Sequence, residues 1–148
     1  MSTQYIILSF LMLAAGLAIP VMATMNGALG AKIGSPFAAS VILFFLAFVV
    51  ALGTTAVSGL PNLSDFYGAP RWWVLGGLVV AFYVIAITTI GPIIGVGQAV
   101  FLVLLGQVLS TALIDHFGWL GMPVSKLSIQ KVLGLCLIVL GIFLARRV

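Results

Sequence analysis

Polar side chains are scarce in this sequence, and the few that interrupt its apolar runs are the residues able to bind a ligand. Asn26, Gln98 and Gln107 carry amides, which both donate and accept hydrogen bonds. Tyr83 and Thr88 add a phenol and an aliphatic hydroxyl as weaker candidates. A binding site of these uncharged groups suits neutral, zwitterionic or apolar solutes, because burying an unpaired cation among amides alone is costly.

The remaining reactive residues give no catalytic or metal site. The 148 residues include one His, one Cys and two acids. His116 and Cys136 are too few for a zinc site, and there is no Ser–His–Asp triad or phosphate-binding loop. The six basic residues are scattered, so nucleic-acid binding has no electrostatic footprint. We therefore expect no enzyme, no metal and no cofactor.

Composition places the polar candidates in a lipid environment. The chain is 64% hydrophobic and 5% charged, whereas charged residues make up about a quarter of a soluble domain. In lipid only helices and closed barrels satisfy their backbone, and unbroken apolar runs of about 20 residues indicate helices. We expect an all-α, multi-pass integral membrane protein that forms one domain over 1–148. The expected helices are 4–30, 37–57, 72–90, 93–114 and 128–145.

Prolines and glycines mark the places where these helices should break. Pro20 removes one backbone donor, so we expect a kink, and the Thr24 hydroxyl can bond to the proline carbonyl one turn back. Gly91 and Pro92 separate the third helix from the fourth. Segment 90–98 forms either a tight connection or a partly unwound stretch that faces a polar cavity.

Two roles stay open for each polar group inside the helices. Asn26 either bonds a neighbouring helix or lines a solute pathway. Gln107, Ser110 and Thr111 share one helical face, which points toward another helix or toward water. The Asp115–His116 pair ends that helix, where a carboxylate opposes the helix dipole. A salt bridge or loop cap holds the carboxylate there, or else it handles protons.

Basic residues are divided evenly between the two sides of the expected bundle. Five spans put three bases on each side, and the positive-inside rule orients a chain by an imbalance of Lys and Arg. The two sets are Arg71, Lys126 and Lys131, and Lys32, Arg146 and Arg147. We therefore expect two copies inserted in opposite orientations and paired as an antiparallel dimer, unless a partner chain fixes one orientation.

The last expected helix carries a stripe suited to such a partner. Gly134 and Gly141 are seven residues apart and nearly on one face, with Ile138 between them. Small residues allow another helix to approach closely in the membrane. We expect these three residues to form the dimer interface.

Several stretches resemble known transporter families. The run from Gly134 to Ile142 resembles the dimerisation motif on the last helix of small multidrug resistance transporters. More closely, "PVMATMNGALG" and "GQVLSTALIDHFGWLG" resemble the five-helix YdcZ-like branch of the drug/metabolite transporter superfamily, and the similarity spans essentially the whole chain. Larger members have ten helices in two inverted repeats, so the resemblance implies one unduplicated half of that architecture.

This resemblance implies a small-molecule transporter of the bacterial inner membrane that works by alternating access, without naming its substrate. Small multidrug resistance proteins carry a cation-binding glutamate on their first helix. This chain has no Glu and offers Asn26 instead. Proton-coupled cation exchange is therefore not carried over. A passive anion channel of the antiparallel-dimer type and a noncatalytic partner subunit of a heterodimer are the alternatives.

Overall fold

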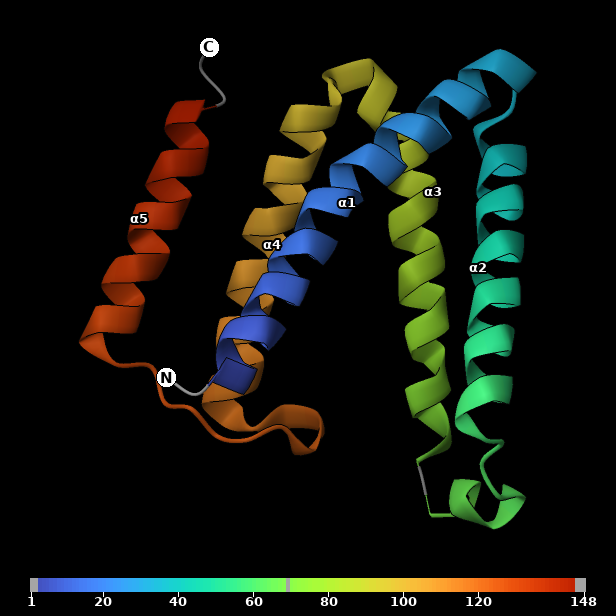
Figure 1. The fold of residues 1–148 in the computed structure, drawn as a ribbon. Coiled ribbons are helices and arrows are strands. Elements are labelled where there is room, and N and C mark those ends of the chain that lie inside the picture. Colours follow the sequence, from blue (N-terminus) through green and yellow to red (C-terminus); the bar gives the residue numbers. More distant parts are fainter. Residues whose placement is uncertain (1–2, 69, 146–148) are drawn as a thin grey trace. The chain divides into compact units, whose positions relative to one another are not determined.

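The chain folds into α-helices, as predicted. The computed structural model describes residues 3–68 and 70–145, and these contain no strand (Figure 1). The helices are α1 (Thr3–Ile33), α2 (Pro36–Ser58), α3 (Gly76–Ile94), α4 (Val96–Phe117) and α5 (Ile129–Ala145). Short 3-10 turns lie between them: η1 (Leu63–Phe66), η2 (Arg71–Leu75) and η3 (Trp119–Gly121).

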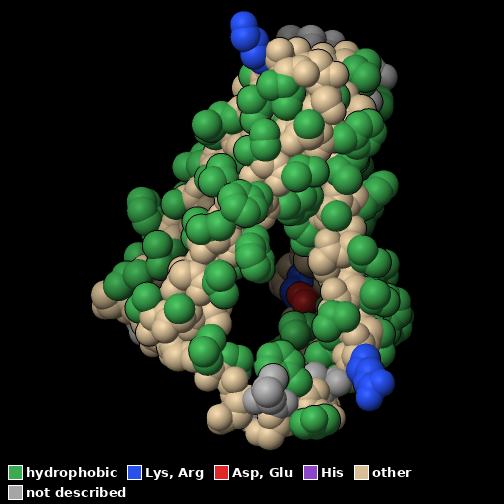
Figure 2. Space-filling model, turned by 90° about the vertical axis from the view of Figure 1, so that its right-hand side faces the viewer, with side chains coloured by type: hydrophobic (Ala, Val, Ile, Leu, Met, Phe, Trp, Pro, Cys, Tyr) green, Lys and Arg blue, Asp and Glu red, His purple; other side chains and the backbone are tan. Residues whose placement is uncertain are grey.

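Length and composition confirm an integral membrane protein. Within the described residues, four segments are long and apolar enough to cross a bilayer: α1, α2, η2 with α3, and α4. Helix α5 has 17 residues, which is about the shortest length that spans the hydrocarbon. Hydrophobic side chains are spread along the whole length of the face shown in Figure 2, as a lipid-facing surface requires.

Two compact units make up the chain, Met1–Val96 and Gly97–Val148. In the first unit α1, α2 and α3 pack against one another (Figure 1). The second unit holds α4, a loop that includes η3, and α5. Each unit is described below by itself.

The first unit is held together by small residues on α1. Ala23, Gly27 and Gly30 are buried and follow one another at intervals of four and three residues, so they share a helix face. A Cβ atom on Gly27 would lie 3.2 Å from the Pro92 ring, and one on Gly30 would lie 3.0 Å from Cα of Pro36. The missing side chains therefore let α2 and α3 reach the α1 backbone.

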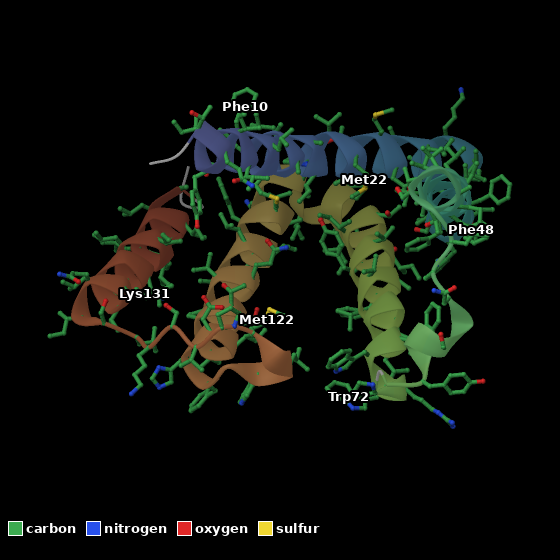
Figure 3. The ribbon with its side chains drawn as sticks, turned by 60° about the horizontal axis from the view of Figure 1, so that its bottom comes forward. Phe10, Met22, Phe48, Trp72, Met122 and Lys131 are labelled. Carbon is green, nitrogen blue, oxygen red and sulfur yellow. The ribbon has the colours of Figure 1, made fainter. Side chains whose placement is uncertain are left out.

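The other half of α1 has no such neighbours. Residues 3–19 are all exposed; Phe10, labelled in Figure 3, is one example at 68%. The core of the first unit therefore lies along the second half of α1 only.

Pro20 lies inside α1 without ending it, and the kink expected there stays a prediction. The helix continues from Thr3 to Ile33 with Pro20 inside it. One proline removes a single backbone hydrogen bond, while the bonds of the neighbouring turns persist. The Thr24 hydroxyl does donate to the Pro20 carbonyl at 2.9 Å, which confirms that predicted contact.

The break between the third and fourth helices lies later than predicted, because α3 ends four residues later and α4 begins three residues later than expected. Helix α3 runs through Gly91 and Pro92 to Ile94. It ends at Gly95, whose φ of 90° lies in a region that favours glycine. Pro92 stands in the last turn, where its ring disturbs only the carbonyl one turn back, so the helix ends at the glycine.

We predict that Gly30→Ala destabilises the first unit, because the added methyl group would press against the Pro36 backbone. The loss should be about 1–3 kcal/mol, measured by thermal unfolding in detergent. Gly16→Ala on the same helix is the control, since nothing lies within 4 Å of its Cβ position. An equal loss in both variants would contradict the packing described here.

Candidate functional site

Asn26 and Thr88, two of the predicted binding residues, form a direct hydrogen bond. The Asn26 Nδ2 atom donates to the Thr88 Oγ1 atom at 2.6 Å. The residues are 5% and 1% exposed, and they join α1 to α3 one residue away from the contact of Gly27 with Pro92. Of the two roles that the sequence leaves open for Asn26, this geometry favours the bond between helices.

The Tyr83 hydroxyl, on α3, is in a different situation. Its oxygen is buried, and among the described residues no group forms a hydrogen bond with it. A buried hydroxyl without a partner costs free energy. Water or a solute with a polar group would remove that cost, so Tyr83 keeps its place among the candidate binding residues.

Gln98 and Gln107, the other amides, are exposed on α4. Neither side chain forms a hydrogen bond within the part of the chain that the structure describes. Gln107 lies near the middle of the 22-residue helix, at the level of the membrane centre if α4 spans the bilayer. Because Asn26 and Gln107 belong to different units, a cavity shared between them stays a prediction.

The hydroxyls beside Gln107 are satisfied within their own helix. Ser110 donates to the Gly106 carbonyl at 2.8 Å, and Thr111 donates to the Gln107 carbonyl at the same distance. Serine and threonine in membrane helices commonly bond to the preceding turn in this way. The polar stripe predicted on α4 therefore contains one unsatisfied group, the Gln107 amide.

The Asp115–His116 pair holds the loop that follows α4. The Asp115 carbonyl accepts a hydrogen bond from the Ser125 amide at 2.7 Å. The His116 ring accepts at Nδ1 from the Leu127 amide at 3.1 Å. These contacts support the loop-cap interpretation, although the bond at Asp115 comes from its backbone and not from its carboxylate.

Part of the predicted dimer stripe faces α4. Gly134 and Ile138 line a pocket of about 280 Å³ between α4 and α5, and Gly141 is exposed. Thr111, Asp115 and Lys131 line the same pocket. Sequence reasoning missed this group. The spacing of Thr111 and Asp115 by one helical turn is a usable signal, but the approach of Lys131 depends on how α5 packs.

No metal site is found in the described part of the chain, where no group of three or more His, Cys, Asp or Glu residues gathers. A family model described as "Putative inner membrane exporter, YdcZ" matches residues 7–144, from within α1 to within α5. Searches of curated proteins and of solved structures returned no significant match.

We predict that Asn26 and Thr88 are energetically coupled. In a double-mutant cycle of Asn26→Ala and Thr88→Val, the interaction energy should be about 1 kcal/mol by unfolding in detergent. Thr89→Val is the matched control, because the Thr89 hydroxyl donates to the Ile85 carbonyl of its own helix. A coupling no larger than that of Asn26→Ala with Thr89→Val would rule out the bond between α1 and α3.

Proposed function

The chain belongs to the YdcZ family of inner-membrane exporters, and from this premise we propose that it moves a small neutral or zwitterionic solute across the membrane by alternating access. Two copies of opposite orientation together form the transporter. The proposal rests on one observation above the others, the exposed and unsatisfied amide of Gln107.

An amide at this position needs a polar partner. Gln107 lies near the middle of an apolar span, and its side chain has no hydrogen bond within the described residues. Transfer of an unpaired amide from water into hydrocarbon costs several kcal/mol. A solute pathway or a facing subunit supplies the missing partner, and polar residues inside spans typically mark such pathways.

The chemistry of the candidate residues limits the solute class. Gln98, Gln107 and the Tyr83 hydroxyl offer hydrogen bonds without a formal charge, whereas Asn26 and Thr88 already bond to each other. The two acids of the chain, Asp65 and Asp115, lie in the segment between α2 and α3 and near the end of α4. A carboxylate to balance a bare cation is therefore missing from the middle of the spans, which favours neutral or zwitterionic solutes.

A second copy in the opposite orientation would complete the pathway. Three bases on each side give no preferred orientation, and five spans are half of a ten-helix inverted repeat. Gly141, exposed on α5, offers that helix as a contact between copies, whereas Gly134 and Ile138 line the pocket that faces α4. Alternating access then follows from two equivalent halves that rock around a site at the midplane.

We predict that the protein is inserted in two orientations. An external reagent should then reach one end of α2 in about half of the molecules and the other end in the rest. In a Cys136→Ser background, single cysteines at Ile33 and at Leu60 lie beyond the two ends of α2. An impermeant maleimide should label about half of the molecules at each position in intact cells. Full labelling at one position with none at the other would show a single orientation, and lysed cells provide the control for complete labelling.

We predict that Gln107→Ala impairs transport without disturbing assembly. Proteoliposomes are tested with radiolabelled glucose and alanine, and with tetraphenylphosphonium as a bare cation. We expect protein-dependent flux of an uncharged or zwitterionic probe, reduced at least about tenfold in Gln107→Ala by the loss of its hydrogen bond. Gln130→Ala, in the first turn of α5, is the matched control. Full flux in Gln107→Ala would remove this residue from the pathway, and flux of the cation alone would refute the solute class.

A further inference from the structure

The pocket between α4 and α5 has two chemically different walls. It has a volume of about 280 Å³, which is near the lower end for small-ligand pockets. Polar groups gather at one part of it and apolar side chains form the rest. The lining residues are Val108, Thr111, Ala112, Asp115, Leu127, Lys131, Gly134, Leu135 and Ile138.

The α4 wall presents hydrogen-bond acceptors. Thr111 and Asp115 are one helical turn apart on the same face. The Thr111 hydroxyl gives its proton to its own helix, so it meets a ligand as an acceptor. The Asp115 carboxylate is half-buried, and among the described residues no cation lies within 4.0 Å of it.

The opposite wall presents a cation. Lys131 lies in the first turn of α5 (Figure 3), and its Nζ atom donates to the Ser125 hydroxyl at 2.6 Å. An ammonium group has three donors, so at least one remains for a ligand. Asp115 and Lys131 thus line one pocket with opposite charges that do not pair with each other, and a ligand with both charges would satisfy both.

The amine of such a ligand should carry N–H groups. Asp115 and Thr111 accept hydrogen bonds, which a primary ammonium donates and a quaternary ammonium cannot. Quaternary ammonium groups are recognised instead by the faces of aromatic rings. None of the residues that line this pocket is aromatic.

The surroundings of the pocket suit a ligand that comes from the bilayer. Phe117 and Trp119 follow the pocket residue Asp115 closely in the sequence, and their rings stack with centroids 5.3 Å apart. Both side chains are exposed, as is typical of aromatic residues at the level of the lipid headgroups. A second groove of about 450 Å³ shares Leu135 with the pocket. Its lining is apolar: Leu109, Val132, Leu135, Cys136, Val139, Leu140 and Phe143.

From these contacts we infer that the α4–α5 pocket binds a zwitterionic phospholipid with a primary-amine headgroup, such as an ethanolamine phospholipid. The ammonium group bonds to Asp115 and Thr111, the phosphate bonds to Lys131, and the acyl chains follow the apolar groove. This site goes beyond the proposed transport function and does not depend on it, because its headgroup contacts, Thr111, Asp115 and Lys131, are not among the residues proposed to bind the transported solute.

Native mass spectrometry of the purified chain tests this with four lipids that share the same acyl chains. The headgroups are ethanolamine, its monomethyl and dimethyl derivatives, and choline. In the wild-type protein the retained lipid should decrease with each methyl group, with about a tenfold difference between the ends of the series. Equal retention of ethanolamine and choline lipids would overturn the inference without any mutation.

Variants of Asp115 and Lys131 test which part of the lipid headgroup each charged side chain binds. Asp115→Asn should remove the preference for ethanolamine over choline, and Lys131→Gln should weaken binding of both lipids. Lys32→Gln, in the last turn of α1, removes a surface charge elsewhere and should change neither. Lipid retention is compared only among variants whose thermal stability equals that of the wild-type protein.

A soluble headgroup compound distinguishes a site for a membrane lipid from a site for a free solute. Glycerophosphoethanolamine at a concentration equal to that of the lipid should fail to displace it, because it lacks the acyl chains. Complete displacement would show a site for soluble zwitterions, and unchanged lipid preference in Asp115→Asn would show that this carboxylate does not bind the amine. Either result overturns the inference.

Discussion

Hydrocarbon offers no hydrogen bonds, and this constraint decides where each polar group of the chain can lie. Several threonine hydroxyls meet it locally: Thr55, Thr89 and Thr111 each donate to a carbonyl of their own helix at 2.8 Å. Such residues can face lipid at little cost, so they mark no binding site by themselves. An amide has two donors and an acceptor oxygen to satisfy, which makes Asn26 and Gln107 the more informative residues.

These two amides meet the constraint differently. Asn26 is buried and bonded to Thr88, next to the place where the missing side chain of Gly27 admits the Pro92 ring. The hydrogen bond and the close approach therefore fix the same crossing of α1 and α3. Gln107 finds no partner within the described residues. One amide thus stabilises the fold, whereas the other is exposed and available to bond to water, a solute or a second copy.

Much of the fold could be predicted from the sequence, because apolar runs and their punctuation act locally. The bond from Thr24 to Pro20 follows from spacing alone, and α2 and α5 begin and end close to the predicted residues. Gly95 was missed because a proline is the stronger signal, although a glycine with positive φ is what ends α3. The bond between Asn26 and Thr88 and the approach of Lys131 to the α4 pocket depend on packing between helices, which one sequence does not reveal.

The length of α1 has a mechanical consequence. Its 31 residues extend about 46 Å, whereas the hydrocarbon layer is about 30 Å thick. A helix with such a mismatch relieves it by leaning away from the membrane normal. Since Gly27 and Gly30 lock its second half against α2 and α3, a thicker bilayer that stands α1 more upright would turn those two helices with it.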